Sequence, residues 1–252
     1  MLRRSLMLAA LAIVLAIAPL PAFAQNVLVN GIDPNPPFVF FAPDGKITGF
    51  DIEALEWIGA NVGFTVEHRP MEWAGIVQSL KDKEIDIIAS GLSITPDRSE
   101  QIAFSKPYWI IDQVVVVRKD SPISDAEDFL KAGHTIGVQR GTSDAAAMEA
   151  ANGQNGRNYT LSQYDSYELV VEDVLNGHVD AAVMNDTAAK AASDQGVKII
   201  GNAGIPEEEF AYGVNKENPE LLVLLNEGLT ALMVAPFWQT LNDRYRPGQV
   251  VN

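Results

Sequence analysis

The stretch EIDIIASGLSITPDR, residues 84–98, contains the pattern on which the fold of this chain depends. Residues 85–89 form a short apolar run typical of a buried strand, and a polar loop follows it. Thr95 is a favoured helix N-cap and Pro96 a favoured first helical residue, so a helix is expected to begin there. A strand that leads directly into a helix is the repeating unit of α/β proteins.

Outward from this stretch, strand-like and helix-like segments alternate along the chain. The patterns predict strands over 27–32, 64–68, 114–119, 135–139, 159–163, 180–184, 197–200 and 209–214. They predict helices over 51–62, 73–83, 143–152, 167–175, 187–193 and 219–232, and another from Pro236. A further helix is expected at Ser124, which has a capping-box spacing to Glu127, and Gly133 is expected to close it. Such alternation favours mostly parallel sheets, and the number of strands favours two α/β lobes.

The composition excludes several classes of function. The chain has 252 residues, 18 Lys and Arg against 33 Asp and Glu, and a net charge of −15. This charge repels phosphate backbones, so no nucleic-acid partner is expected. The absence of cysteine excludes disulfides, thiolate zinc sites, a cysteine nucleophile and lipid attachment through cysteine.

The N-terminus has the pattern of a secretory signal. Arg3 and Arg4 precede an apolar run, and Ala22-Phe23-Ala24 is a small-x-small cleavage site. A membrane anchor is less favoured, because the uncharged run is shorter than the roughly 20 residues that a spanning helix needs. Residues 1–24 are therefore predicted to be a signal peptide that is removed on export.

Two loops carry residues suited to binding an anion. Ser93 and Arg98 flank the junction of strand and helix described above, where free backbone amides favour negative charge. Arg98 adds a planar cation suited to a carboxylate, although it could instead pair with a surface acid such as Asp97 or Glu100. The second loop, QRGTS (139–143), also follows a strand and precedes a helix. It offers the Thr142 hydroxyl and the Ser143 amide.

Seven motifs in order across nearly the whole predicted mature chain resemble those of the bacterial periplasmic solute-binding proteins that deliver polar amino acids to ABC importers (family 3). The motifs are GID and PPF (31–33 and 36–38), TGFDIE (48–53), MEWAGI (71–76), IDIIASGLSITPDR (85–98), FSKPY (104–108), GVQRGT (137–142) and GHVDAAVM (177–184).

The resemblance implies a type II periplasmic-binding-protein fold. Each lobe would hold a mixed, mostly parallel sheet flanked by helices, and two hinge strands would join the lobes. Lobe 1 is expected over 26–111 and 207–252, and lobe 2 over 112–206. The implied partners are a small carboxylate, such as a polar amino acid, and a membrane ABC permease. A periplasmic monomer without a cofactor is expected.

The resemblance also assigns roles to individual residues. Arg98 and Ser93, helped by Thr142, are expected to hold the ligand's α-carboxylate, and the Gly91 carbonyl is expected to accept from its α-ammonium. The positions of three aromatic residues line the pocket in the family, although core packing is the better expectation for Phe50. The three are Phe38, Phe50 and Trp73, of which Trp73 matches an aromatic wall.

At three positions of the expected pocket, the sequence allows more than one role. Asp33 matches a position that often faces a polar or cationic side chain, but it could equally be a turn residue before Pro34. The family usually has an acid where this chain has Asn185, and the next residue is Asp186. Either Asp186 shifts into the pocket or Asn185 contacts the ammonium through its amide oxygen. Asp186 could also merely cap the following helix.

Transport binding by hinge closure is the favoured function, and no catalytic residue is assigned. A cyclohexadienyl or prephenate-type dehydratase on the same fold is the alternative, because such a substrate would not need an acid that pairs with an ammonium group. A sensory module is a third class. His68, His134 and His178 lie far apart without ligand spacing, so no metal site is predicted.

Overall fold

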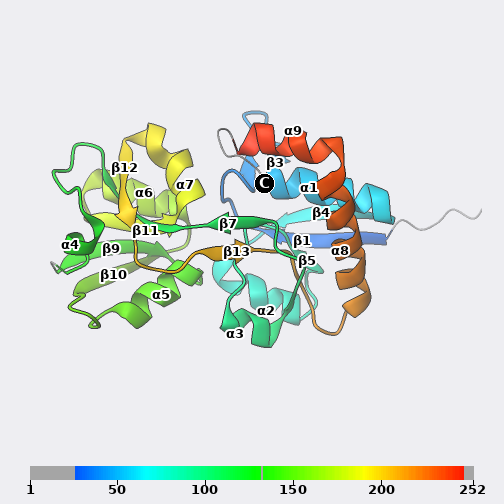
Figure 1. Ribbon diagram of the computed structural model, residues 1–252, viewed down its shortest axis with the longest axis horizontal. Coiled ribbons are helices and arrows are strands. Elements are labelled where there is room, and N and C mark those ends of the chain that lie inside the picture. Colours follow the sequence, from blue (N-terminus) through cyan, green and yellow to red (C-terminus); the bar gives the residue numbers. More distant parts are fainter. Residues whose placement is uncertain (1–25, 132, 247–252) are drawn as a thin grey trace, which may run out of the picture.

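The computed structural model describes residues 26–131 and 133–246, and it consists of two lobes side by side (Figure 1). Each lobe has one five-stranded sheet. The order in lobe 1 is β4 (Phe64–Pro70), β1 (Asn26–Ile32), β5 (Ile87–Ile88), β14 (Gly213–Val214) and β6 (Ala103–Phe104). The order in lobe 2 is β10 (Tyr159–Tyr164), β9 (His134–Gln139), β11 (Ala181–Asn185), β8 (Gln113–Arg118) and β12 (Val197–Asn202).

The two sheets share one pattern of strand directions. In each, the first three strands are parallel, and the fourth is antiparallel to both of its neighbours. Four of the five strands in each sheet therefore run the same way. The predicted α/β fold with two mixed, mostly parallel sheets is confirmed.

Helices cover both faces of each sheet (Figure 1). In lobe 1, α1 (Phe50–Val62), α8 (Pro219–Val234) and α9 (Pro236–Tyr245) lie on one side, and α2 (Ile76–Lys81) and α3 (Pro96–Gln101) on the other. In lobe 2, α4 (Ala126–Phe129) and α5 (Ser143–Ala151) pack with one core cluster, and α6 (Tyr167–Asn176) and α7 (Asp186–Ala192) with another. Burial of these apolar faces is the main source of stability for both lobes.

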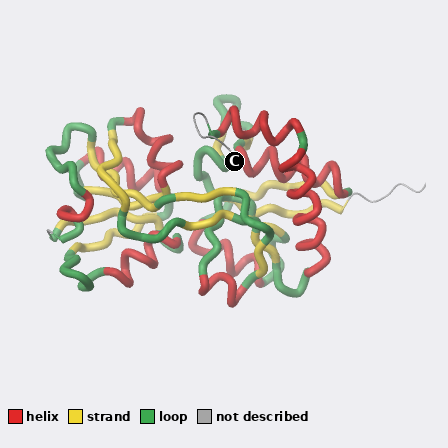
Figure 2. The backbone as a smooth tube through the Cα atoms, viewed as in Figure 1, coloured by secondary structure: helices red, strands yellow, loops and turns green. Residues whose placement is uncertain are grey.

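Two antiparallel strands connect the lobes. They are β7 (Trp109–Ile111) and β13 (Glu208–Phe210), which pair from Trp109 with Phe210 to Ile111 with Glu208. Figure 2 shows the pair crossing the middle of the molecule, and β7 leads directly into β8 of lobe 2. The chain thus passes to lobe 2 and back through adjacent strands, which are the two expected hinge strands.

Several predicted elements differ in detail. The helix predicted over 73–83 is a 3₁₀ turn, Trp73–Gly75, followed by α2, and the strand predicted over 209–214 is divided into β13 and β14. The N-cap of α4 is Asp125, which accepts from the Asp128 amide, and not Ser124. The strands β2 (Phe40–Phe41), β3 (Ile47–Thr48), β6 and β7 were not predicted. Strands of two or three residues are too short to show a periodicity.

Among the described residues, no single helix has the length and apolar composition needed to cross a membrane. Within 26–131 and 133–246, one pair of helices, α8 and α9, meets that criterion together, and the two are bent by 82° relative to each other. Four of the six leucines of α8, at positions 221, 225, 229 and 232, are buried in the lobe 1 core. The predicted signal peptide, residues 1–24, lies outside the described residues.

Candidate ligand-binding site

A polar pocket lies between the two lobes. Lobe 1 and the hinge contribute Asp33, Asn35, Trp73, Gly91, Ser93, Arg98 and Phe210. Lobe 2 contributes Gln113, Gln139, Thr142, Ser143, Asp144, Tyr167 and Asn185. Eight of the ten predicted site residues are in this set; the exceptions are Phe38 and Asp186.

Arg98 is the one cation among the pocket-lining residues of the described chain, and it is nearly buried. Its side chain comes from the first turn of α3, and the residue is 8% exposed. As predicted, Thr95 caps this helix by accepting from the Arg98 amide. Nη1 donates to the Ser93 carbonyl at 3.0 Å, and Nη2 donates to the Gly141 carbonyl in lobe 2 at 3.1 Å. Arg98 therefore bridges the cleft.

No carboxylate pairs with Arg98 inside residues 26–131 and 133–246, so the alternative of a surface ion pair is not what the structure contains. Burial lowers the pKa of Arg98, and the charges of Glu208 and Asp144 oppose this shift. A guanidinium remains charged in such surroundings. A buried cation held only by carbonyl oxygens is suited to an incoming anion.

The lobe 2 loop brings hydroxyl groups to the same place. Thr142 caps α5 by accepting from the Ala145 amide at 3.2 Å, and its hydroxyl donates to the Gln139 carbonyl at 2.7 Å. Ser143 Oγ lies 3.2 Å from Ser93 Oγ across the cleft and donates to Glu208 Oε2 on the hinge at 2.6 Å. The two predicted loops therefore face each other.

Gly141 allows this close approach of the lobes. Its φ is +79°, and a Cβ atom built on it would lie 2.8 Å from Ala74 Cα in lobe 1. No side chain fits in that space. The close backbone approach at Gly141 is thus a contact between the two lobes.

Asp33 also bridges the cleft. Its Oδ2 accepts from Gln139 Nε2 at 2.7 Å, and the Ser90 hydroxyl donates to the Asp33 carbonyl at 2.8 Å. Burial raises the pKa of the Asp33 carboxyl to about 6, with Gln139 opposing the shift and Glu168 and Glu72 adding to it. Asp33 is thus a pocket residue as well as the residue before a proline.

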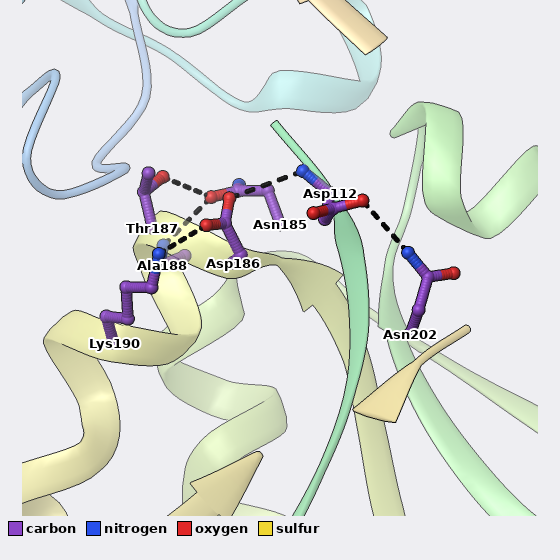
Figure 3. A network of polar contacts seen from close by, with 7 residues as sticks. All are labelled: Asp112, Asn185, Asp186, Thr187, Ala188, Lys190 and Asn202. Atoms are coloured by element: carbon purple, nitrogen blue, oxygen red, sulfur yellow. Dashed lines mark hydrogen bonds and ion pairs between the residues drawn. The ribbon is translucent and has the colours of Figure 1, made fainter. Parts of the chain in front are cut away.

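Asn185 and Asp186 face different surroundings (Figure 3). Asn185 is the N-cap of α7: its Oδ1 accepts from the Ala188 amide and the Thr187 hydroxyl. Its Nδ2 lies 3.3 Å from Asn35 Oδ1 across the cleft. In this structure the Asn185 amide oxygen, which was expected to contact an ammonium group, is engaged by two donors of the helix.

Asp186 does not line the pocket, and it is not the helix cap. Its carboxylate pairs with Lys190 one turn along α7 and accepts weakly from the Asp112 amide at 3.4 Å (Figure 3). The expected shift of Asp186 into the pocket does not occur, because the capping side chain of Asn185 sets where α7 begins and Asp186 follows on its outer side.

The aromatic predictions have a mixed outcome. Trp73 lines the pocket, and its ring lies 5.7 Å from Arg98 Cζ. Phe38 does not line it: the residue is fully buried and packs edge-on against Trp109 and Phe210 at 4.7 and 5.0 Å. Phe50 is core, as favoured. Phe38 lies in the core because the loop that carries it packs on α1 and the hinge.

A buried carboxylate supports the pocket from behind. Asp51 Oδ2 accepts from the Gly91 amide at 2.7 Å and from the Tyr108 hydroxyl at 2.8 Å. Gly91 has a φ of +65°, and a Cβ there would lie 2.5 Å from Asn35 Nδ2. Burial raises the pKa of Asp51 to about 7, against the hydrogen bonds from Tyr108 and Gly91. Asp51 thus fixes the loop that presents Gly91.

Sequence reasoning did not assign six of the lining residues: Asn35, Gln113, Gln139, Asp144, Tyr167 and Phe210. Gln139 is the first residue of the predicted QRGTS loop and Asp144 directly follows its last, so the loop signal already pointed to this segment. Tyr167 begins α6, and Gln113 and Phe210 belong to β8 and to the hinge strand β13. Their place at the pocket depends on how the lobes pack. In the described part of the chain, no group of three His, Asp or Glu residues could hold a metal ion.

The fold and the pocket define a two-lobed solute-binding protein. The family model for bacterial extracellular solute-binding proteins, family 3, matches residues 28–248. The chain belongs to this family.

Similarity to individual proteins agrees with the family. The chain is 27% identical over 228 residues to the L-cystine-binding protein TcyJ of Escherichia coli (strain K12), covering 88% of this chain and 83% of TcyJ. It is similar to an ancestral arginine-binding protein solved with arginine bound, with a TM-score of 0.80, 31% identity and coverage of 88% and 98%. It is also similar to AncCDT-1, an ancestral amino acid-binding protein described as a precursor of cyclohexadienyl dehydratase, with a TM-score of 0.79, 27% identity and coverage of 87% and 95%.

Proposed function

We propose that this protein is the solute-binding component of an ABC importer and that its lobes close on a polar amino acid or a similar small carboxylate. The observation that carries the proposal is the Arg98 guanidinium, which is nearly buried in the cleft without a carboxylate partner. The family membership and the amino-acid-binding relatives support the same function.

The ligand's carboxylate takes the place of the two carbonyl oxygens that Arg98 contacts. The hydroxyls of Ser93 and Ser143, which lie 3.2 Å apart on opposite lobes, flank this position. Both carbonyls are neutral acceptors, whereas a carboxylate brings the opposite charge and can accept two parallel N–H bonds from a guanidinium, so a ligand competes effectively with these carbonyls. Trp73 and Phe210 provide apolar surface beside it.

The remaining polar groups favour a polar or cationic side chain on the ligand. Asp33 and Gln139 face each other at 2.7 Å, and both line the pocket. A cationic or amide group can insert between a carboxylate and a carboxamide and bond to both. Relatives named for arginine and cystine binding support a ligand of this class.

Closure occurs by rotation of the lobes about β7 and β13. The proposed lobes are residues 26–111 with 207–252 and residues 112–206. Only the closed form contacts the ligand from both lobes, so the ligand shifts the equilibrium between the open and closed forms. The closed monomer then docks on a membrane permease.

The protein acts outside the cytoplasm. Relatives in the family are extracellular or periplasmic binding proteins. We propose that residues 1–24 direct export and are removed, which leaves the protein in the periplasm.

A dehydratase that acts on a prephenate-like acid is the second candidate. One observation favours it: the pocket holds two carboxyl groups, Asp33 and Asp144, whose pKa values burial raises to about 6 and about 7. A general acid needs a pKa near the working pH. Against it, the similar AncCDT-1 is described as an amino acid-binding precursor of such an enzyme.

A thermal-shift screen separates the two candidates. The purified protein is tested with the twenty common amino acids, L-cystine and prephenate, and hits are measured by calorimetry. The proposal predicts that an amino acid raises the melting temperature and is recovered unchanged, because a ligand of the native state stabilises it by mass action. Turnover of prephenate without binding of any amino acid would contradict it.

A further inference from the structure

Asp144 lines the pocket and carries a buried oxygen atom that has no hydrogen-bond partner. It is the second residue of α5, is fully buried, and lines the cavity. Its Oδ1 accepts from the Tyr167 hydroxyl at 2.9 Å, whereas its Oδ2 has no hydrogen-bond partner. The hydroxyl of nearby Thr142 donates to the Gln139 carbonyl. Leaving a buried carboxylate oxygen unpaired is costly, so this oxygen is suited to a donor from the ligand.

Asn185 stands where the family usually has an acid, but its side chain cannot accept a hydrogen bond from an ammonium group. Asn185 Oδ1 is occupied by two donors of α7, the Thr187 hydroxyl and the Ala188 amide. Only its NH₂ group is directed toward the cleft, at 3.3 Å from Asn35 Oδ1. That group is itself a donor and does not attract a cation.

Asp186 is no substitute for this acid. Its carboxylate is paired with Lys190 and lies outside the pocket lining. Glu208 is also engaged, because its Oε2 accepts from the Ser143 hydroxyl at 2.6 Å and lies 3.3 Å from Gln113 Nε2. Among the described acids that line the pocket, Asp144 is the one with a fully buried carboxylate oxygen that has no hydrogen-bond partner.

Asp144 also lies at the correct end of the pocket. Its negative charge acts on the Arg98 guanidinium, and it follows Ser143 in the chain. The charges that act on Asp33 are instead those of Glu168 and Glu72. In an α-amino acid the carboxylate and the ammonium are attached to the same carbon, so their two binding groups must be neighbours. Arg98 and Asp144 satisfy this condition.

Resting on the proposed function, we propose that Asp144 Oδ2 accepts the hydrogen bond of the ligand's α-ammonium group and supplies its counter-charge in place of an acid at position 185. The ligand class is therefore the zwitterionic α-amino acid, and carboxylates without the amine are poor ligands. Tyr167 holds the other oxygen of Asp144 and positions the carboxylate.

Calorimetry with matched ligand pairs tests this assignment. The first probe is whichever of the twenty common amino acids and L-cystine binds most tightly, and the second is the des-amino analogue of that amino acid. For L-arginine the analogue is 5-guanidinopentanoate. We expect the wild type to prefer the amino acid by about 30-fold or more, since breaking a desolvated charge pair costs at least that much. Asp144→Asn is expected to remove this preference and to leave the affinity for the analogue within about threefold.

Three further variants keep the test specific. Asp186→Asn is the matched control and is expected to leave both affinities unchanged. Tyr167→Phe keeps the charge and is expected to retain the preference. Asn185→Asp in the Asp144→Asn background is expected to restore part of the preference for the amino acid, because it places a carboxylate at position 185. Aspartate caps α7 as well as asparagine does, so the helix is kept.

The outcomes separate this inference from the proposed function. Unchanged amino-acid affinity in a folded Asp144→Asn variant overturns the inference alone. Equal wild-type affinity for the amino acid and its analogue also overturns it, whether or not any variant folds, and leaves carboxylate binding intact. Binding of neither probe by the wild type refutes the proposed function, and the inference fails with it.

Discussion

Gln139 of lobe 2 donates from Nε2 to Asp33 Oδ2 of lobe 1 at 2.7 Å, and both residues are buried. This contact joins the end of β1 to the end of β9, so it forms only when the lobes are closed. A hydrogen bond to a charged group contributes about 1.5–3 kcal/mol. Together with the contact between Arg98 and Gly141, it stabilises the closed form from both ends of the pocket.

Replacing Gln139 by Ala is expected to shift the protein toward the open form. Loss of the contact leaves Asp33 without its donor across the cleft, and the closed form loses stability relative to the open one. Small-angle scattering of the ligand-free protein is expected to give a larger radius of gyration for Gln139→Ala than for the wild type. The exposed Gln239→Ala, on α9 and away from the cleft, is the control. Identical scattering of the wild type and Gln139→Ala would show that this contact does not contribute to closure.

Gly141→Ala is expected to impede closure on the ligand. The new Cβ would lie 2.8 Å from Ala74 Cα, and the backbone has a φ of +79°. Gly153→Ala has a similar φ, +80°, but a Cβ there meets nothing within 4 Å, so it measures the conformational strain alone. We expect both variants to lose about 1 kcal/mol of stability and only Gly141→Ala to lose ligand affinity, by about tenfold or more. Equal affinities of the two variants would contradict the close approach of the lobes at this glycine.

The affinity for a ligand with a cationic side chain is expected to fall as the pH is lowered through about 6. Burial raises the pKa of Asp33 to about 6 in the empty site. A cation binds the ionised form, so the contribution of Asp33 to the affinity is full above this pH and falls by up to about tenfold per pH unit below it. Calorimetry with L-arginine between pH 7.5 and 5.0 measures this slope. In Asp33→Asn the contribution of Asp33 to the slope is absent, and an unaltered slope in that variant would assign the effect to another group.

Asp51→Asn is expected to change how stability depends on pH. The pKa of Asp51 is raised from 3.8 to about 7 in the folded protein, mainly by burial. Between these two values the folded state holds a proton that the unfolded state has released, so this carboxyl adds stability as the pH falls from about 7 toward 4. Its largest slope is about 1.4 kcal/mol per pH unit. Urea unfolding at pH 5.0 and 8.0 measures the difference between wild type and variant.

The free energy of unfolding of the wild type, relative to that of Asp51→Asn, is expected to be higher at pH 5.0 than at pH 8.0. The exposed Asp44→Asn is the control and is expected to keep the wild-type dependence. Parallel pH profiles of wild type and Asp51→Asn would mean that Asp51 is already ionised in the folded protein at pH 5.0.

Those parts of the site that depend on local sequence signals were predictable. Thr95 and Thr142 cap helices directly after strands, and such N-caps have strong residue preferences, so both loops and Arg98 could be placed before the structure was known. The alternation of strands and helices likewise predicted the two α/β lobes. These features arise from interactions between residues close together in the chain.

The rest of the site depends on contacts between distant segments. Tyr167 and Gln113 reach the pocket only because α6 and β8 pack beside the lobe 2 loop. The sequence left both Asn185 and Asp186 open as candidates for the ammonium contact. In the structure, Asn185 Oδ1 caps α7 and the Asp186 carboxylate pairs with Lys190. Phe38 was assigned to the pocket by family position, and packing against Trp109 keeps it in the core.

The most direct measurement is the affinity of Arg98→Ala for the amino acid that the wild type binds most tightly, determined by calorimetry. Arg140→Ala is the matched control, because Arg140 lies in the facing loop, is exposed, and pairs with Asp165. We predict that Arg98→Ala loses about 2–5 kcal/mol of binding free energy, as expected for a desolvated charge pair, while Arg140→Ala binds as the wild type does. Wild-type affinity in a folded Arg98→Ala variant would contradict the account of a carboxylate held at this arginine.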